Sequence, residues 1–569
     1  MSDLKKSKSK SFMGNVAIVL MAQLTVKILG MVYRMVITNI DGFGDAGNGF
    51  YTAGFQIYTV LLAISSVGIP NALAKMVSER IALTDYKGAH KIFKTALILF
   101  SIIGVVCSAI LFFGADFIAH RIINMDGAQY TVRALSPSIF FVCVSSVIRG
   151  YFQGMNNMDA TSRSQIIEQI FKCSITILLV ALAVGQPPEI MAAWANAASS
   201  IATFLSFGYL FMFYKKRQRG IGEQIRQTAV ESLSMGTGKL MKAILMLSIP
   251  ISLASIITAI NRVIDTATIT RGIEIAFSGG IPAYLDAAGK TVAAIANPTT
   301  AQLNAEAVRL AGMLSKSDTL INMPLALNFA FSTVLVPAIA GALAVGDKEE
   351  AANKASYSFL ISTILILPCA IGYIVLAAPI YRVIYPAAPM GYDLLALTAI
   401  SLIFSALSQT MSGALQGIGK VYVPAIGLLV GCLIKIILNV ILIRIPEVNI
   451  YGAVVSSIVC QIVAFLISFI VMAKYITLKI GLIKYIVKPL IAGVLMGAAV
   501  WGAYTLCQNI FGFTPYITHL VSVILSIAIG AIVYGVLVFV LKILNEEEVK
   551  MLPGGTSIYR MLVKLKIYK

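Results

Sequence analysis

The chain has 569 residues, of which 58% are hydrophobic and only 12% are charged. Soluble globular proteins carry about 25% charged residues and disordered chains have low hydrophobicity, so this chain belongs to neither class. Its composition is that of a multi-pass membrane protein. The net charge of +19 would suit nucleic-acid binding, but lysine and arginine also collect in the cytoplasmic loops of membrane proteins. Their positions therefore decide between the two explanations.

The first segment carries four lysines before position 11, and an apolar run begins at Phe12. A secretory signal peptide opens in the same way, but its apolar run is shorter and ends at a small-residue cleavage site. We therefore predict that this run is an uncleaved first span.

A membrane-spanning helix needs about 20 mostly apolar residues, and fourteen such spans follow one another along the chain. They cover residues 12–39, 49–74, 95–115, 133–154, 164–184, 191–214, 241–265, 319–346, 355–378, 394–419, 422–444, 448–473 and two spans within 489–541. The double run is interrupted near 511–515. The predicted fold class is an all-α polytopic membrane protein with 14 transmembrane helices.

Basic residues gather on one side of these predicted spans. If the N-terminus is cytoplasmic, the inner segments hold the basic clusters at 75–91, 215–219, 474–488 and 564–569. The outer loops without any lysine or arginine are 40–48, 185–190, 445–449 and 508–516. By the positive-inside rule we predict a multi-pass protein of the cell membrane with both termini cytoplasmic. This distribution accounts for the net charge, so no nucleic-acid partner is expected.

Two sequence repeats indicate that a six-helix unit is duplicated. RGYFQG at 149–154 matches SGALQG at 412–417, and each closes the fourth span of a six-span block. Pro70 and Pro337 lie at corresponding positions, and their separation nearly equals that of the two repeats. The predicted organisation is an N-lobe (1–214), a basic cytoplasmic linker (215–240), a C-lobe (241–475), spans 13 and 14 (476–545) and a basic cytoplasmic tail (546–569). The C-lobe includes a long outer loop at 266–316, in which we expect one or two short amphipathic helices.

Enzyme and cofactor motifs are weak. Gly289, Lys290 and Thr291 imitate the end of a phosphate-binding loop, but Tyr284 stands where that motif needs a glycine. The three histidines have no metal-ligand or triad spacing, and the seven cysteines lie in apolar runs without a CxxC pair. We expect a transporter rather than an enzyme, with no metal or organic cofactor.

Ionisable residues inside spans are costly and usually face a cavity or the bundle interior, so they are the candidates for function. Lys27 and Arg34 lie seven residues apart on span 1, roughly on one helical face. Arg262 and Asp265 lie on span 7, three residues apart, so they could pair with each other. Lys435 lies in the middle of span 11.

Three further charged residues have simpler interpretations. Glu168 and Lys172 lie four residues apart on span 5, in the order that favours an ion pair within one helix. Arg149 ends span 4, where its side chain could extend to the cytoplasmic edge of the membrane.

Spans 1 and 7 are equivalent positions in the repeat, and both carry an arginine. Transporters built from repeats bind substrate at the repeat interface, so cations from both halves would attract an anion there. Arginine suits phosphate because its planar guanidinium can bind two oxygens. Neutral polar residues in the spans could supply hydrogen bonds to sugars. These are Gln23, Asn39, Gln56 and Asn328.

Three stretches resemble the MurJ/SpoVB-like branch of the multidrug/oligosaccharidyl-lipid/polysaccharide exporter superfamily. They are VKILGMVYRMVITNIDGFGDAGNGFY (26–51), GIPNALAKMVSER (68–80) and RGYFQGMNNMDATSRSQIIEQIFK (149–172). The resemblance implies two six-helix lobes and a final helix pair that forms a groove for a lipid tail. It also implies that Lys27, Arg34 and Arg262 are basic residues of the transport cavity. Gram-negative members commonly show Arg-Asp late in span 1, whereas Arg34 is followed here by Met35, as in Gram-positive YtgP-type members.

The resemblance implies a bacterial flippase that moves an undecaprenyl-pyrophosphate-linked glycan, first of all the peptidoglycan precursor lipid II, to the outer leaflet by alternating access. Its partners would be that lipid, the bilayer and cell-wall synthesis proteins. Membrane potential, protons or sodium could drive the movement. The alternatives are an exporter of another polysaccharide repeat unit, a cation-coupled multidrug antiporter, and a membrane enzyme or scaffold of envelope synthesis. A drug antiporter would favour carboxylates in its cavity, and here cations outnumber them.

Overall fold

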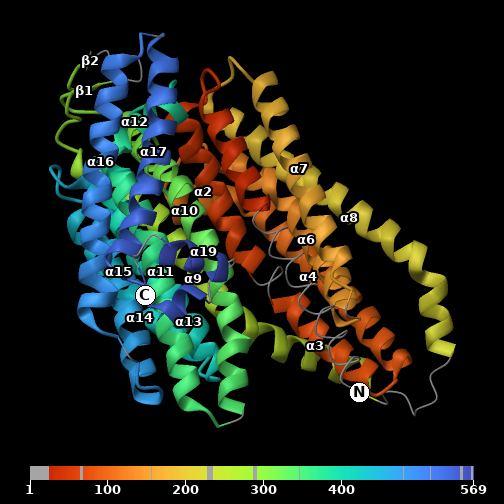
Figure 1. Cartoon of the computed structure of the whole chain (residues 1–569). Helices are drawn as coiled ribbons and strands as arrows, with labels where there is room; N and C mark the ends of the chain where they lie inside the picture. Colours follow the sequence, from red (N-terminus) through yellow and green to blue (C-terminus); the bar gives the residue numbers. More distant parts are fainter. Residues whose placement is uncertain are drawn as a thin grey trace. The chain divides into compact units, whose positions relative to one another are not determined.

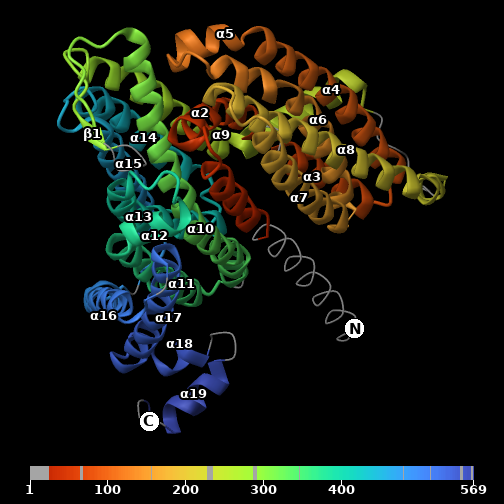
Figure 2. The same cartoon turned by 90° about the horizontal axis from the view of Figure 1, so that it is seen from above.

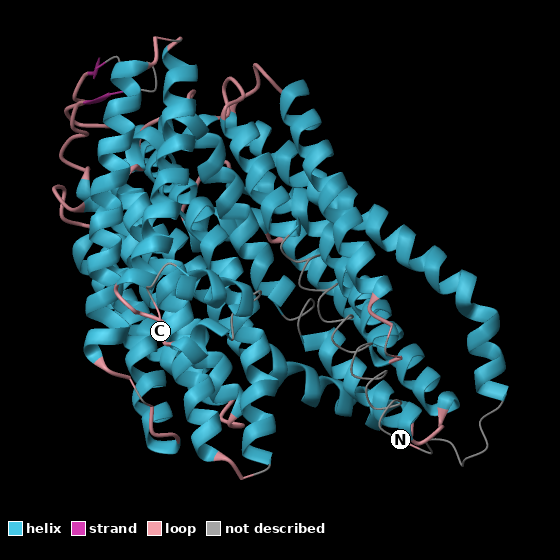
Figure 3. Cartoon of the chain, viewed as in Figure 1, coloured by secondary structure: helices cyan, strands magenta, loops and turns pink. Residues whose placement is uncertain are grey.

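The computed structural model describes residues 25–63, 68–155, 157–226, 235–285, 291–344, 346–478, 480–512, 514–550, 555–564 and 568. Within these residues the chain is almost entirely helical, and one small two-stranded sheet is present (Figure 1, Figure 3). The all-α fold class expected from the sequence is therefore confirmed.

A helical segment at 25–38 precedes the labelled elements. Those elements are α2 (Gly44–Ala63), α3 (Ile69–Ala82), α4 (Tyr86–Phe113), α5 (Ala115–Phe117), η2 (Ile118–Ile123), α6 (Ala128–Gly154), α7 (Asp159–Leu182), α8 (Pro188–Arg226), α9 (Thr237–Ala276), β1 (Tyr284–Leu285), β2 (Thr291–Val292), α10 (Thr300–Ala344), α11 (Lys348–Val375), α12 (Ala377–Ile384), α13 (Tyr392–Gly417), α14 (Tyr422–Leu442), α15 (Asn449–Tyr475), η3 (Ile483–Val487), α16 (Lys488–Ile510), α17 (Pro515–Val540), α18 (Glu546–Lys550) and α19 (Gly555–Lys564).

In the described part of the chain, 10 helices are long and apolar enough to cross a membrane. They coincide with ten of the predicted spans, and the interruption predicted near 511–515 separates α16 from α17. The other four predicted spans fall on the segment at 25–38, on α2 with α3, on α9 and on α10. The total of 14 transmembrane helices stays a prediction.

The structure corrects the expectation of a long outer loop at 266–316. Helix α9 continues to Ala276 and α10 begins at Thr300, so the connection is much shorter, and it carries strands β1 and β2 instead of short amphipathic helices. An apolar run marks only the part of a helix that lies in the membrane. Both helices extend beyond that part through segments that contain charged residues, such as Arg271 and Glu274 in α9 and Glu306 and Arg309 in α10.

The chain divides into two compact units. Unit 1 comprises Met1–Tyr284, Thr291–Ser315 and Asn439–Ile450, and unit 2 comprises Leu285–Lys290, Lys316–Leu438 and Tyr451–Lys569. Helix α9, which follows the predicted linker, is thus part of unit 1. The lobe boundaries derived from the repeat describe a different property, namely duplication, and remain predictions.

In unit 1, helix α6 is mostly buried, and it packs against α2, α3, α4 and α8 (Figure 1, Figure 2). Small residues let α2 come close to its neighbours. A Cβ added at Gly54 would lie 2.3 Å from the Thr131 hydroxyl, and one added at Gly49 would lie 2.3 Å from the backbone carbonyl of Val308 on α10. These approaches fix the position of α2, which carries one wall of the candidate site.

In unit 2, α11 packs against α13 and α16 packs against α17 (Figure 2). The end of the chain is tied to this unit. Lys484 Nζ lies 2.7 Å from both carboxylate oxygens of Glu548, and the Tyr357 hydroxyl donates to the backbone carbonyl of Glu548. Helix α18 is therefore anchored to η3 and α11.

Candidate functional site

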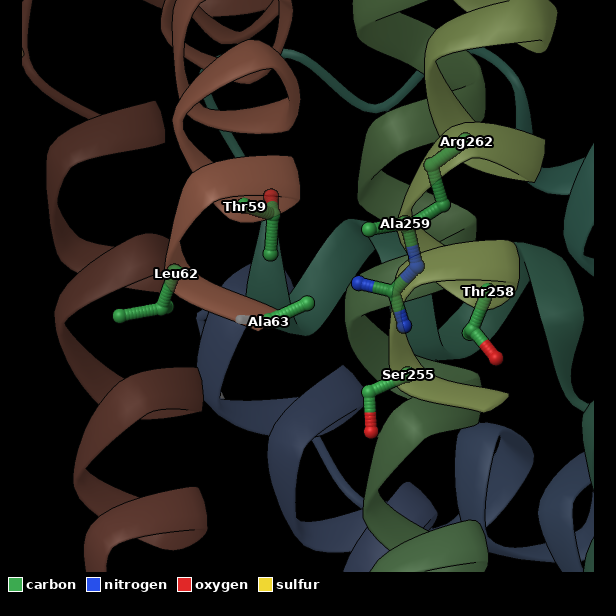
Figure 4. A pocket seen from close by; sticks show the side chains of 7 residues that line it. All are labelled: Thr59, Leu62, Ala63, Ser255, Thr258, Ala259 and Arg262. Carbon is green, nitrogen blue, oxygen red and sulfur yellow. The ribbon is translucent and has the colours of Figure 1, made fainter. Parts of the chain in front are cut away.

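A cavity of about 230 Å³ lies inside unit 1, between α2 and α9 (Figure 4). Helix α2 contributes Thr59, Leu62 and Ala63. The side chains from α9 are those of Ser255, Thr258, Ala259 and Arg262. The cavity thus combines one guanidinium and three hydroxyl groups with a small apolar surface.

Among the described residues that line this cavity, Arg262 is the one that carries a charge. Its side chain runs along α9 and its guanidinium lies between α9 and α2 (Figure 4). Lys27, on the segment at 25–38, is close enough for the positive charge of Arg262 to act on it. Both side chains are exposed. Two of the cations selected from the sequence, one from span 1 and one from span 7, therefore lie in the same part of unit 1.

Helices α2 and α9 run antiparallel, and α9 contacts α2 beyond one end of the cavity and the start of α3 beyond the other. At one end the Thr266 hydroxyl donates a hydrogen bond to the Gln56 side-chain carbonyl. At the other end Gly68 packs directly on α9, where an added Cβ would lie 1.8 Å from the Ser252 hydroxyl oxygen. Gln56, expected to bind a sugar, here holds the two walls of the cavity together.

Arg34 differs from Arg262 in its surroundings. It is only 8% exposed, and its guanidinium donates hydrogen bonds to the hydroxyls of Thr52 (3.1 Å) and Ser315 (2.6 Å). It also lies 4.4 Å from the centre of the Tyr51 ring. The structure therefore places Arg34 in the packing between the first segment, α2 and α10.

The structure corrects the expected pairing between Glu168 and Lys172. Among the described residues the ion pair of Glu168 is with Arg149, at 2.8 Å. Arg149 is 8% exposed and also donates to the hydroxyls of Ser164 and Ser206, so it does not extend to the membrane edge. A pair within one helix is visible in the sequence, whereas a partner on another helix depends on the fold.

The remaining candidates that the structure describes are not among the residues of the cavity wall. Asp265 accepts a 3.4 Å hydrogen bond from Asn439, which also donates to Thr268. Asn328 belongs to unit 2, where its buried amide donates to the Ala406 carbonyl at 2.9 Å. Gln23 lies outside the described residues, as do Gly289 and Lys290 of the loop-like motif.

Sequence reasoning missed the hydroxyl groups of the cavity. Ser255, Thr258, Ala259 and Arg262 follow the i, i+3, i+4, i+7 spacing of one helical face, and Thr59, Leu62 and Ala63 follow the i, i+3, i+4 spacing. A search for small and hydroxyl residues on the helical face of Arg262 would have found the α9 wall.

The ten helices of the described residues that are long and apolar enough to cross a membrane define the class of the protein, a multi-pass membrane protein. A solved structure of the lipid II flippase MurJ in an inward closed conformation has the same fold. It aligns with a TM-score of 0.66 over 92% of this chain and 98% of that chain, at 15% sequence identity.

The chain belongs to the polysaccharide biosynthesis protein family, whose sequence profile matches residues 12–343. The profile of the lipid II flippase MurJ matches residues 294–522. Among curated proteins of Bacillus subtilis (strain 168), lipid II flippase MurJ is 25% identical over 93% of this chain and 95% of its own length. Stage V sporulation protein B is 21% identical over 96% of this chain and 98% of its own length. The resemblance to the MurJ/SpoVB-like branch is confirmed.

Proposed function

We propose that this protein is a flippase that moves an undecaprenyl-pyrophosphate-linked glycan, with lipid II as the first candidate, from the inner to the outer leaflet by alternating access. The observation that carries the proposal is the cavity between α2 and α9, where Arg262 and the nearby Lys27 supply positive charge and no carboxylate is found among the described lining residues. The names of the relatives, lipid II flippase among them, support the substrate class.

The chemistry of the cavity suits a pyrophosphate. A guanidinium can bind two phosphate oxygens at once, and the Ser255 hydroxyl can donate a further hydrogen bond. A lipid tail needs apolar surface, and α16 and α17 carry such surface in residues including Trp501 (62% exposed) and Ile532 (67% exposed). We propose that this helix pair contacts the polyprenyl chain.

Membrane potential is a sufficient source of energy for a charged substrate, since it supplies about 2.3 kcal/mol per charge per 100 mV. Coupling to protons or sodium is the alternative that we keep. Proteoliposomes with an imposed potential but no proton or sodium gradient separate the two drivers.

A second candidate substrate is the repeat unit of another polysaccharide. The relationship to stage V sporulation protein B and the match to the polysaccharide biosynthesis family favour keeping it. A cationic drug is a weaker candidate, because Arg262 and Lys27 would repel it.

The deciding experiment is complementation in a bacterium whose own lipid II flippase can be switched off. We expect the chain to restore growth and to make lipid II accessible at the outer surface, with membrane expression verified. Cell lysis despite good expression would overturn the lipid II assignment and favour another lipid-linked glycan.

A further inference from the structure

One face of α2 meets three cations at successive helical turns. Tyr51, Phe55 and Thr59 lie four residues apart, so they share a face and are separated by about 6 Å along the axis. The rings of Tyr51 and Phe55 are stacked, with centroids 5.8 Å apart. Arg34 lies over Tyr51, Lys172 lies over Phe55, and Arg262 shares the cavity with Thr59.

The two outer members of this series differ in accessibility. Arg34 is buried and held by the hydroxyls of Thr52 and Ser315. Arg262 is exposed and lines the cavity. The accessible end of the series is therefore the one at the cavity.

Lys172 is the middle member and comes from α7. Its Nζ lies 4.5 Å from the centre of the Phe55 ring and 5.7 Å from that of Tyr33. The carboxylate one turn earlier, on Glu168, is bound to Arg149 at 2.8 Å. Lys172 is half-buried, so its ammonium group rests on an aromatic surface and keeps part of its area accessible.

We infer that Lys172 is a second anion-binding residue, which holds the phosphate-bearing head group of the substrate one helical turn from Arg262. This inference rests on the proposed function. The aromatic surface fixes the position of the ammonium group without neutralising its charge, because a ring attracts the cation through its quadrupole only. Phe55, which lies under Lys172, and Thr59, which shares the cavity with Arg262, are one turn or about 6 Å apart along α2, so one extended anionic group can bind both cations.

The variants that test this are Lys172→Gln, which removes the charge, and Lys172→Arg, which keeps it. Lys215 provides a matched control, because its Nζ lies 4.8 Å from the Phe211 ring on α8, away from the cavity residues. Lys215→Gln thus removes the same kind of cation–π contact without touching the series on α2.

The measurement is calorimetric titration of the purified full-length protein in detergent with inorganic pyrophosphate. We expect Lys172→Gln to weaken binding about tenfold, as loss of one charge-assisted hydrogen bond does. Lys172→Arg should bind within a few-fold of the wild type, and Lys215→Gln should bind like the wild type. Combined with Arg262→Gln, Lys172→Gln should be non-additive, because both residues act on one ligand.

A second measurement needs no substitution. Chemical acetylation of lysines in the wild-type protein, followed by mass spectrometry, should slow at Lys172 when pyrophosphate is present and stay constant at Lys215. Unchanged acetylation of Lys172, or full affinity in Lys172→Gln, would overturn the inference. If Arg262→Gln alone loses binding, the proposed function stands without Lys172. If pyrophosphate binding depends on both residues but complementation fails, the anion site stands and the substrate assignment fails.

Discussion

Arg34 and Arg262 carry the same charge but have different parts in unit 1. Arg34 donates to two hydroxyls and rests on Tyr51 in a buried position, whereas Arg262 extends into the cavity. Removing Arg34 deletes two hydrogen bonds from a buried charged donor, although the Thr52 and Ser315 hydroxyls still bond to each other, and such a loss costs about 1–3 kcal/mol. An exposed cation contributes little to stability, so its value lies in what it binds.

We therefore predict that Arg34→Ala lowers the thermal midpoint of the purified protein, and that Arg262→Ala abolishes transport at an unchanged midpoint. Thermal unfolding in detergent and transport in proteoliposomes measure the two effects. Equal midpoints in both variants would contradict the structural part assigned to Arg34, and full transport by Arg262→Ala would contradict the cationic cavity.

At the scale of elements, the spans could be predicted because hydropathy is a local property of the sequence. The break before Pro515 and ten of the apolar helices follow from it. The polar extensions of α9 and α10 could not be predicted in this way, because helix outside a membrane has no apolar signal. The partner of Glu168 was missed because Arg149 lies on another helix, and only the tertiary arrangement brings the two together.

Close backbone approach between α2 and α10 leads to the second prediction. A Cβ added at Gly312 would lie 1.8 Å from the backbone carbonyl oxygen of Asp45, and backbone atoms cannot move aside as a flexible side chain does. We expect Gly312→Ala to destabilise the protein by about 1–3 kcal/mol, the cost of overpacking, measured as a lower thermal midpoint.

The control for this prediction is Gly208→Ala on α8, where nothing lies within 4 Å of the added atom. Because alanine is the better helix residue, this change should keep or raise stability by up to about 1 kcal/mol. An unaffected Gly312→Ala variant would mean that α2 and α10 do not pack as described.

At the scale of the whole molecule, the distribution of lysine and arginine predicts how the chain is oriented in the membrane. The basic clusters fall between alternate spans, and the tail keeps Lys484 and Glu548 together on the side that the positive-inside rule assigns to the cytoplasm. The orientation and the duplicated lobes remain predictions from the sequence.

Labelling of intact cells tests this orientation. Gln186→Cys, in an exposed loop before α8, should react with a membrane-impermeant maleimide, and Arg219→Cys, near the far end of the same helix, should react only after cell lysis. Labelling of the parent protein gives the background from its native cysteines. The reverse order of reactivity would contradict the predicted orientation and place both termini outside the cytoplasm.

The contact of Gly68 with α9 has a consequence for the balance between conformations. A methyl group at this position would lie 2.6 Å from the backbone carbonyl oxygen of Ser248, which cannot rotate aside as the Ser252 hydroxyl can. It meets no such atom in a state where α3 and α9 have separated. A difference of about 5.5 kcal/mol between two states is enough to change their ratio from 1:99 to 99:1. A Gly68→Ala substitution should therefore shift the equilibrium toward a conformation in which α3 and α9 are apart. That conformation would then be populated enough for structure determination.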